Sequence, residues 1–402
     1  MVTKIERSLR KMLTSGESHG RGLCVTLVGV PAGLELDIDM VNAELARRQR
    51  GYGRGGRMKI EADCIDVLSG LRHGRTLGSP ITLLIWNRDW ASWQEDMSPG
   101  LTSGIETLRP PVRRPRPGHA DLAGALKFGH RDLRDVLERA SARETAARVA
   151  AGAVCKQLLA LMGVAIRSQV LSIGEVVAQR GDLARQEVWE AVEASPVRCA
   201  DPQAAERMCS AIDAAKEAGD SLGGRGEVVA FGVPPGLGSY ATWQERLDAR
   251  IAAAVMSIPS AKAVEIGEGW ASANLPGSRV HDAIVPDDSR PWGTRRSTNR
   301  AGGIEGGVSN GEPIVVRVAF KPIPTLRKPL LSVDLDTGQP CEAHAERSDV
   351  CVVPAACVVA EAMMAIVLAE AALEKFGGDS VADFVGSWER YLERLREIGG
   401  RP

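Results

Sequence analysis

Aromatic side chains and lysines are scarce in this sequence. Aromatic residues make up 4% of the 402 residues, so the bases of a nucleic acid would find few rings on which to stack, and we expect no nucleic-acid partner. Only ten of the 50 basic residues are lysines. Arginine supplies the rest, and its planar fork binds phosphate and carboxylate groups through paired hydrogen bonds. A codon bias of the genome explains the same excess, and composition alone favours that explanation.

Neither paired cysteines nor a long uncharged apolar run is present. The eight cysteines have no CxxC pair and no metal-ligand spacing to a histidine, so we expect reduced thiols in the cytoplasm and no metal site. The most apolar stretch, residues 354–373, contains Glu361 and Glu370, which predicts a buried helix and no membrane partner. We expect no signal peptide, because no apolar stretch follows the basic N-terminus. The remaining composition is typical of a soluble globular protein.

Three pairs of similar segments follow the same order in the two halves of the sequence. They are 25–36 with 228–239, 58–63 with 262–267, and 78–85 with 311–318. A duplicated unit of strand, turn, helix, strand, loop and strand would give this order. We therefore predict one domain, 1–402, with pseudo-repeated halves at roughly 8–205 and 206–380 and an amphipathic tail at 381–402. Chance similarity between turns rich in glycine and proline is the alternative.

Two helices are indicated by apolar spacing and by end signals. Ser141 and Glu144 predict a capping box before a helix that Gly163 would end. A second helix would run from about Pro354 to Phe376, with proline in its first turn. Both are apolar or small on every side, which indicates helices enclosed by sheets. The glycine-rich segment 296–313 is predicted to be a functional loop.

The segment GYGRGG, residues 51–56, has the letters of a dinucleotide-binding fingerprint. A helical pattern precedes it and a strand pattern follows, the reverse of what that fingerprint requires. Five arginines without local carboxylate partners surround it: Arg47, Arg48, Arg50, Arg54 and Arg57. Their mutual repulsion favours a phosphorylated or polycarboxylate ligand among them, with a solvated face as the alternative.

Two of the six histidines have small neighbours and nearby arginines. His19 lies in TSGESHGRG (14–22), and His119 lies in RRPRPGHAD (113–121). We expect tight turns to present both rings without a bulky residue shielding them. Such rings could act as general acids on an anionic substrate near neutral pH. Ordinary polar turn residues are the alternative.

Two arginines precede the predicted helices. Arg139 comes just before the N-cap Ser141, where free backbone N–H groups and the helix dipole favour a phosphate, such as that of a cofactor. An ordinary capped helix is the alternative there. Arg347 and Asp349 come just before the second helix, and such Arg–Asp neighbours are usually structural.

Ten motifs follow one another along about residues 8–380: GESHGRG, RRQRGYGRGGRM, VLSGLRHGRTLGSPI, RPRPGHAD, ERASARETAARVAAGAV, GDSLGG, MSIPSAKAVEIG, RSTNRAGGIEGGVSNGEPI, KPIPT and RSDVCVVPA. In content and order they resemble the chorismate synthase family from start to end. As a set they are highly specific for that family.

The resemblance implies an α+β fold, namely a β-α-β sandwich with a pseudo-duplicated core whose helices are enclosed by antiparallel sheets, and a homotetramer. It implies a carbon–oxygen lyase of the shikimate pathway, which leads to aromatic amino acids. The reaction would be a 1,4-anti elimination of phosphate from 5-enolpyruvylshikimate 3-phosphate to give chorismate. Reduced FMN would be required without net redox change, and NADPH is a candidate source of electrons.

The resemblance also implies roles for residues at matching positions. His19 matches a histidine beside the substrate phosphate, His119 one against the flavin, and Asp349 an acid that assists flavin N5 in removing the ring proton. The matches for binding the substrate or an NADP phosphate are Ser18, Arg48 and Arg54. The matches for the flavin-binding set are Arg139, Ala140, Ser141, Pro259, Ser260, Gly306, Lys321, Pro322, Ile323, Pro324, Thr325 and Arg347.

Four positions depart from the family pattern. Leu122 and Phe128 stand where tyrosine is frequent, and Pro324 stands where serine is common. Arg225 adds a charge where the family is usually apolar. The named acids and arginines are all present, so we expect activity.

Two other functions remain open on the sequence. An NADPH-dependent flavin reductase lacks its nucleotide fingerprint here, but NADPH-driven reduction of bound FMN would identify it. A phosphate- or RNA-binding module built on the arginine-rich loops would show salt-sensitive RNA retention and no phosphate release.

Overall fold

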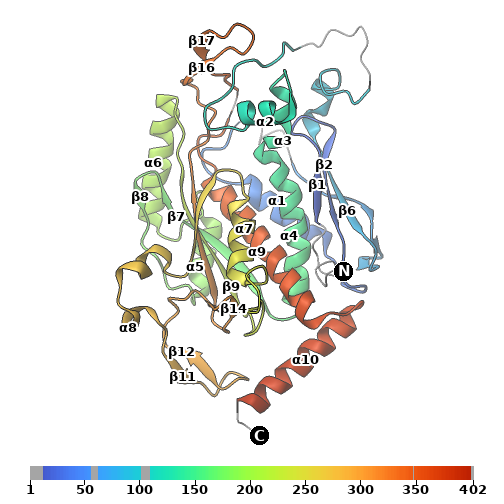
Figure 1. Ribbon diagram of the computed structural model, residues 1–402, viewed down its shortest axis with the longest axis vertical. Coiled ribbons are helices and arrows are strands. Elements are labelled where there is room, and N and C mark those ends of the chain that lie inside the picture. Colours follow the sequence, from blue (N-terminus) through green and yellow to red (C-terminus); the bar gives the residue numbers. More distant parts are fainter. Residues whose placement is uncertain (1–11, 56–61, 101–108, 347, 400–402) are drawn as a thin grey trace.

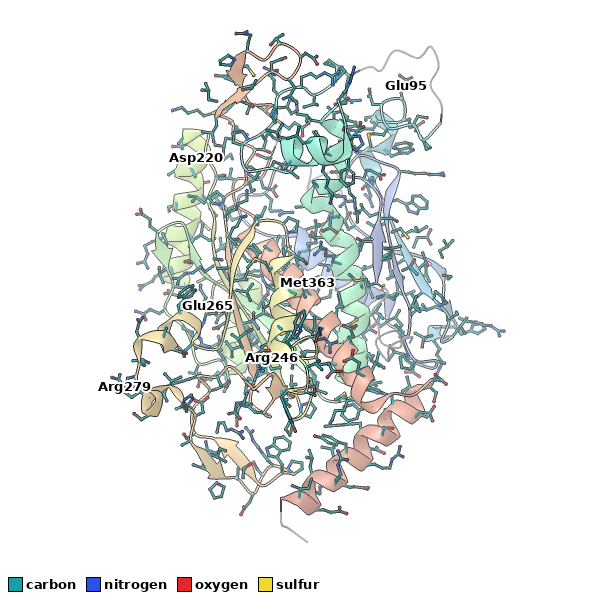
Figure 2. All side chains as sticks on the ribbon, viewed as in Figure 1. Glu95, Asp220, Arg246, Glu265, Arg279 and Met363 are labelled. Carbon is teal, nitrogen blue, oxygen red and sulfur yellow. The ribbon has the colours of Figure 1, made fainter. Side chains whose placement is uncertain are left out.

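The computed structural model describes residues 12–55, 62–100, 109–346 and 348–399. In these residues two antiparallel sheets enclose a layer of helices, so the predicted β-α-β sandwich of the α+β class is confirmed (Figure 1). Helix α4 (Thr145–Ala160) packs on the first sheet and α9 (Val353–Phe376) on the second, and the two helices pack on each other. Figure 2 shows Met363 of α9 in the interior, whereas Glu95, Asp220 and Arg279 lie at the periphery.

The first sheet has the strand order β1-β2-β6-β3. Its strands are β1 (Leu13–Ser15), β2 (Gly22–Leu27), β6 (Ile81–Trp86) and β3 (Asp66–Ser69). Every second residue of β2 and β6 is buried, the pattern of a sheet with one face on a core. Helix α1 (Ile38–Gln49), which Asp37 caps, packs against α4 and α9.

The second sheet has the strand order β10-β15-β9-β7-β8. Its strands are β10 (Ala261–Ile266), β15 (Ile314–Phe320), β9 (Gly224–Phe231), β7 (Ala165–Ile173) and β8 (Val176–Val177). Helix α9 packs on β7 and β9 of this sheet, and α7 (Leu247–Met256) packs on α9 and on the edge strand β10. Long buried runs in β9 and β15 show that both faces of this sheet are covered.

The two halves share one order of elements. The series β1, β2, α1, β3, β6, α4 has its counterpart in β7, β9, α7, β10, β15, α9. In both sheets the second and fourth strands of the series are neighbours, flanked by the first and the third. This shared order supports the predicted duplication, which stays a prediction. The similar segment 58–63 falls mostly outside the described residues.

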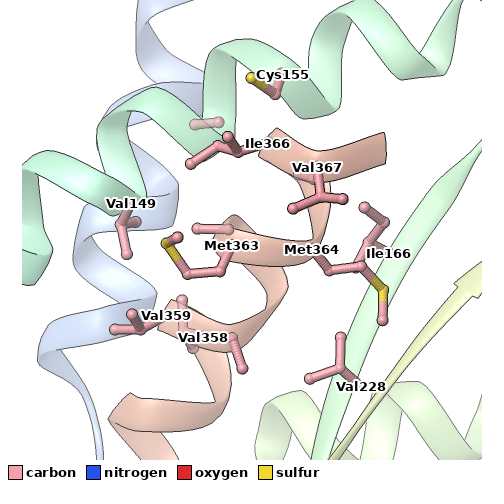
Figure 3. Packing of buried hydrophobic residues seen from close by; sticks show 14 of the residues in the cluster. Val149, Cys155, Ile166, Val228, Val358, Val359, Met363, Met364, Ile366 and Val367 are labelled. Carbon is pink, nitrogen blue, oxygen red and sulfur yellow. The ribbon is translucent and has the colours of Figure 1, made fainter. Parts of the chain in front are cut away.

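Helix α9 is the centre of the hydrophobic core, and 20 of its 24 residues are buried. Figure 3 shows Met363 on the side of α4 and Met364 on the side of Ile166 in β7 and Val228 in β9. By length and composition α9 could cross a membrane, but 89% of its apolar window is buried in the protein. The helix predicted at Pro354–Phe376 is therefore confirmed as a core helix.

One carboxylate is enclosed within this core. Glu361 of α9 is fully buried and lies 2.9 Å from Arg47 Nη1, 2.5 Å from Lys156 Nζ and 3.3 Å from Arg198 Nη2. Burial raises the pKa of this carboxyl, but the three cations outweigh burial and hold the pKa well below its usual range. Arg47 also binds Glu44, three residues earlier on α1, at 2.7 Å, so the expectation that it has no local carboxylate partner is wrong.

The remaining elements surround the sandwich. The other helices are α2 (Asp121–Phe128), α3 (Arg134–Ala140), α5 (Gln186–Ala194), α6 (Pro202–Ala218), α8 (Gly277–Val280) and α10 (Val381–Ile398). Short 3-10 helices cover Arg88–Ser92, Ala142–Glu144 and Gly269–Asn274. Two-stranded hairpins join β4 (Leu71–Arg72) to β5 (Arg75–Thr76), β11 (Ile284–Pro286) to β12 (Thr294–Arg296), β13 (Ile304–Glu305) to β14 (Val308–Ser309), and β16 (Leu331–Val333) to β17 (Pro340–Glu342).

The predicted capping box at Ser141 is wrong in one respect. Ser141 caps the 3-10 turn that precedes α4, and its Oγ accepts the N–H of Arg143 at 3.3 Å. The Glu144 carboxylate binds Arg148 at 2.7 Å and does not complete a capping box. The ion pair with Arg148, one turn later on the helix, competes for the glutamate that the box would need.

Candidate active site

His19 lies in the tight loop between β1 and β2. Gly16 has a φ of +97°, and a Cβ there would lie 2.2 Å from the Gly22 carbonyl oxygen, so the loop requires glycine. The Ser18 N–H donates to the Glu138 carbonyl oxygen at 3.0 Å. This bond fixes the loop against the end of α3.

The Glu138 carboxylate holds the His19 ring. Both of its oxygens lie 2.9 Å from His19 Nδ1, and one accepts the His19 backbone N–H at 2.8 Å. Glu138 is 2% exposed, and Arg134 one turn earlier lies 3.4 Å from its Oε1. A carboxylate hydrogen-bonded to Nδ1 fixes the tautomer and the orientation of the ring.

The expectation that no bulky residue shields His19 is wrong. Trp93 stacks on the ring with centroids 4.0 Å apart and planes inclined by 24°. Arg109 lies 3.8 Å and Arg134 5.1 Å from the centroid of the same tryptophan ring. The His19 side chain keeps 17% exposure, so one face of it is covered while part of the ring stays accessible.

His119 lies in the turn before α2 and has a carboxylate of its own. Its Nδ1 lies 2.5 Å from Asp121 Oδ1 and 3.1 Å from Arg116 Nη2. Arg116 donates to both Asp121 oxygens, at 2.8 and 3.0 Å. Burial raises the pKa of the Asp121 carboxyl, but hydrogen bonds from His119 and Arg116 outweigh burial and hold it below its usual range.

The segment predicted to bind flavin after β15 adjoins the His119 turn. Arg116 Nη1 donates to Thr325 Oγ1 at 2.9 Å, and Lys321 Nζ donates to the Gly118 carbonyl oxygen at 2.6 Å. The Lys321 N–H in turn donates to the Ser260 carbonyl oxygen at 2.9 Å. The structure thus brings His119, residues 321–325 and Ser260 together.

Asp349 is held by the arginine-rich loop. Arg54 Nη1 lies 3.0 Å from Asp349 Oδ2, and the Gly55 N–H donates to Oδ1 at 2.5 Å. The neighbouring Ser348 donates its hydroxyl to the Thr325 carbonyl oxygen at 2.8 Å. Asp349 therefore lies close to the segment 321–325, and Arg54 pairs with its carboxylate.

Arg48 is buried at the start of α4. Its Nε donates to Thr145 Oγ1 and its Nη2 to the Ala142 carbonyl oxygen, both at 3.0 Å. Asp63 lies 3.6 Å from its Nη1 and binds Arg143 at 2.6 Å. Burial lowers the pKa of Arg48 to about 10 against the attraction of Asp63. The positive charges gathered here suit an anion.

Some predicted site residues lie elsewhere or have other partners. Arg139 donates to the Gly16 carbonyl oxygen at 3.0 Å and to Thr14, so its guanidinium secures β1. Gly306 lies in the β13–β14 turn next to Gly307, whose carbonyl oxygen accepts the N–H of Leu247 at the start of α7, whereas Ser260 comes after the other end of that helix. Arg347 and Arg57 fall outside the described residues.

Sequence reasoning missed Glu138, Trp93, Arg134 and Glu346. Their partners lie far away in the sequence; Glu138, for example, is 119 positions from His19. Glu138 does stand in a recognised motif, ERASARET, but as a carboxylate before the helix it resembled ordinary surface charge. Asp121 follows His119 by two residues in PGHAD, and this spacing was a local signal for a carboxylate that holds the ring.

A model of the family described as chorismate synthase matches residues 10–373. The chain belongs to the chorismate synthase family. It is similar to the chorismate synthase of Symbiobacterium thermophilum, with 56% identity covering 96% of this chain and 99% of that protein. The chorismate synthase of Geobacter sulfurreducens is 54% identical with the same coverage. A crystal structure of a chorismate synthase, 43% identical, matches with a TM-score of 0.77 over 96% of this chain and 98% of its own.

A chorismate synthase is a lyase of the shikimate pathway that eliminates phosphate from 5-enolpyruvylshikimate 3-phosphate with the help of reduced flavin. The residues present fit a flavin. The Ser260 hydroxyl oxygen is buried without a hydrogen-bond partner among the described residues, and Ser260 has a φ of +74°. An unpaired buried hydroxyl in a sparsely populated backbone conformation is typical of a ligand site.

The departures from the chorismate synthase pattern lie at different depths. Leu122 and Phe128 of α2 are exposed, at 42% and 67%. Arg225 donates from Nε to Ser172 Oγ at 3.2 Å at the start of β9. Pro324 is the departure next to the site, because a Cβ at Gly118 would lie 3.5 Å from its Cβ.

Proposed function

We propose that in this chain His19 is the acid that protonates the leaving phosphate of 5-enolpyruvylshikimate 3-phosphate. The observation that carries the proposal is the buried Glu138 carboxylate at His19 Nδ1, which favours a proton on the ring. The carbon–oxygen bond breaks with its electron pair on the phosphate, and a proton from Nε2 makes that phosphate a better leaving group.

Arg48 and Arg54 are proposed to bind the anionic substrate, with Ser18 beside His19. Arg48 lies with Arg143 around Asp63 at the N-terminal turn before α4, where backbone N–H groups also favour an anion. Arg54 is paired with Asp349, so a ligand would share this cation with the carboxylate. Asp349 is proposed to assist removal of the ring proton in the same step.

The flavin-binding set is proposed to be Ser260 with Pro259, residues 321–325, the backbone of Arg139–Ser141, Gly306 and Arg347. His119 adjoins residues 321–325 and is proposed to hold a proton against the reduced ring system. Reduced FMN would supply electron density that stabilises positive charge developing on the substrate. The Asp121 carboxylate keeps His119 oriented toward this place.

NADPH as the electron source, a homotetramer and a cytoplasmic location belong to the same proposal. Apolar side chains on the first sheet support oligomerisation: Leu13, Leu68 and Trp86 are 72%, 68% and 45% exposed. All eight cysteines are free thiols, which suits a reducing compartment.

The test is an anaerobic assay with purified protein, photoreduced FMN and 5-enolpyruvylshikimate 3-phosphate. Chorismate absorbance and free phosphate are followed together, with wild type, His19→Gln and the matched control His130→Gln, whose ring is 38% exposed. We expect both products to rise only with reduced flavin, and to rise slowly in His19→Gln alone.

A second arm of the assay replaces photoreduced FMN by oxidised FMN and NADPH. Product formation there would show that the chain reduces its own flavin. NADPH oxidation in this second arm, with no chorismate formed in either arm, would identify a flavin reductase and overturn the proposal. Equal rates for His19→Gln and wild type would remove His19 from the chemistry.

A further inference from the structure

Glu346 lies between the two histidine sites. Its Oε2 is 4.0 Å from Arg116 Nη1, and its Oε1 is 3.9 Å from Arg134 Nη1. It is half-buried and follows β17 at the same end of the molecule as α2 and α3 (Figure 1). One carboxylate therefore faces both arginines.

Each of these arginines contacts the carboxylate that orients one histidine. Arg116 binds Asp121, which holds His119 Nδ1, and Arg134 binds Glu138, which holds His19 Nδ1. The seven groups alternate in charge along a continuous series: His119, Asp121, Arg116, Glu346, Arg134, Glu138 and His19. With both rings protonated the series carries one net positive charge, and with both neutral one net negative charge.

A third histidine also contacts Glu346. His344 Nε2 lies 3.0 Å from Glu346 Oε1. This hydrogen bond lowers the pKa of the Glu346 carboxyl, partly against burial, and the charges of Arg116 and Arg134 act in the same direction. Glu346 is thus an anion at neutral pH.

We infer that Glu346 is a positioning residue that sets the protonation of His19 and His119 together. It compensates Arg134, which contacts the carboxylate at His19, and Arg116, which contacts both Asp121 and His119. It acts through Arg116 and Arg134. Without its charge, both arginines would present more positive potential to the rings, and both imidazolium ions would become less favourable. The inference rests on the proposed roles of the two histidines.

The experiment is a pH titration of the ligand-free protein with histidines labelled at the ring carbon and followed by NMR. Six ring signals are expected, and His19→Gln and His119→Gln assign the two that matter. In Glu346→Gln we expect both to titrate at lower pH by about half a unit, the order of effect of one partly screened charge two groups away. His73 and His281 serve as internal references.

Three further variants sharpen the test. Glu346→Ala removes the same charge and replaces Glu346→Gln if that variant does not fold. Glu346→Asp keeps the charge and should restore both titrations to near wild type. Glu342→Gln removes an exposed acid from the same segment and should move neither.

Movement of only one histidine, or of neither, would overturn the inference. In Glu346→Gln the alkaline limb of the pH dependence of kcat/KM should also move to lower pH, by about half a pH unit. Titrations that move while this limb stays in place would support the coupling and contradict the proposed role of the histidines, so the two failures are distinguishable.

Discussion

The His19 and His119 sites use the same parts in different arrangements. Each ring has Nδ1 on a buried carboxylate, and an arginine meets each carboxylate. At His119 all three residues lie within six positions of one turn, from Arg116 to Asp121. At His19 they come from two segments, and Trp93 from a third covers the ring. His119 is therefore oriented by a local turn, and His19 only by the complete fold.

The largest difference between the sites is expected in catalysis. His19→Ala should lower kcat by about 10²–10⁴-fold, the usual contribution of a general acid, and leave flavin binding largely unchanged. His119→Ala should instead increase the pH sensitivity of the spectrum of the bound reduced flavin. Steady-state rates and flavin titration of both variants check this; unchanged turnover in His19→Ala would show that the site at His19 is not the acid.

The buried pair at His119 should contribute more to stability. Asp121→Asn leaves Arg116 buried without its anion, so we expect a loss of about 3 kcal/mol at pH 7. Because the folded pKa of Asp121 is depressed, this stability is present above the unfolded pKa of about 3.9 and is lost as pH falls toward the folded value. Urea unfolding at pH 7 and near pH 3 measures it.

The matched control for that experiment is Asp336→Asn. Asp336 pairs with Arg113 at 2.9 Å, but its side chain is 67% exposed. An exposed ion pair should contribute less than about 1 kcal/mol. Equal losses in both variants, or a loss at Asp121 that does not shrink in acid, would contradict the assignment of a buried, charge-dependent pair.

Glu138→Gln tests whether the long-range carboxylate orients His19 as closely as Asp121 orients its ring. The amide keeps one acceptor oxygen but loses the charge that stabilises the imidazolium and one of its two bonds to His19. We expect kcat to fall by about 10–100-fold with the alkaline limb at lower pH. A fall in thermal stability with an unchanged pH profile would indicate packing alone.

Trp93 should have the smallest effect. Trp93→Phe keeps a stacked ring and should lower kcat less than about threefold, whereas Trp93→Ala should lower it by about threefold to tenfold, the worth of one aromatic contact. The difference between the two variants is the measurement that matters. If both behave alike, stacking on His19 does not set the position of the ring.

The parts that the sequence predicts are those specified by neighbouring residues. An apolar run, a proline in the first turn and Gly377 at the end predict the helix at 353–376, and the structure confirms it. The sequence predicts Ser141 as a cap, and the structure confirms it. A 3-10 turn lies between Ser141 and α4, and Glu144 binds Arg148 instead of completing a capping box. The motifs also identify the family, because a matched set of ten carries far more information than periodicity.

The partners of His19 could not be predicted in the same way. Trp93 and Glu138 meet that ring only after β1, β2 and α3 have assembled, and no spacing in the sequence encodes such a meeting. Similarly, the ion pairs of Arg47 with Glu361 and of Arg48 with Asp63 could not be predicted, because the partners are distant in sequence.

The central position of α9 also governs how the protein is made. Its first residue, Val353, is synthesised when most of the 402 residues already exist, yet the inner face of the second sheet and one side of α4 need it for cover. During translation those surfaces have no permanent partner, and exposed apolar strands are prone to aggregate. Packing of the sandwich can therefore finish only after α9 has been synthesised.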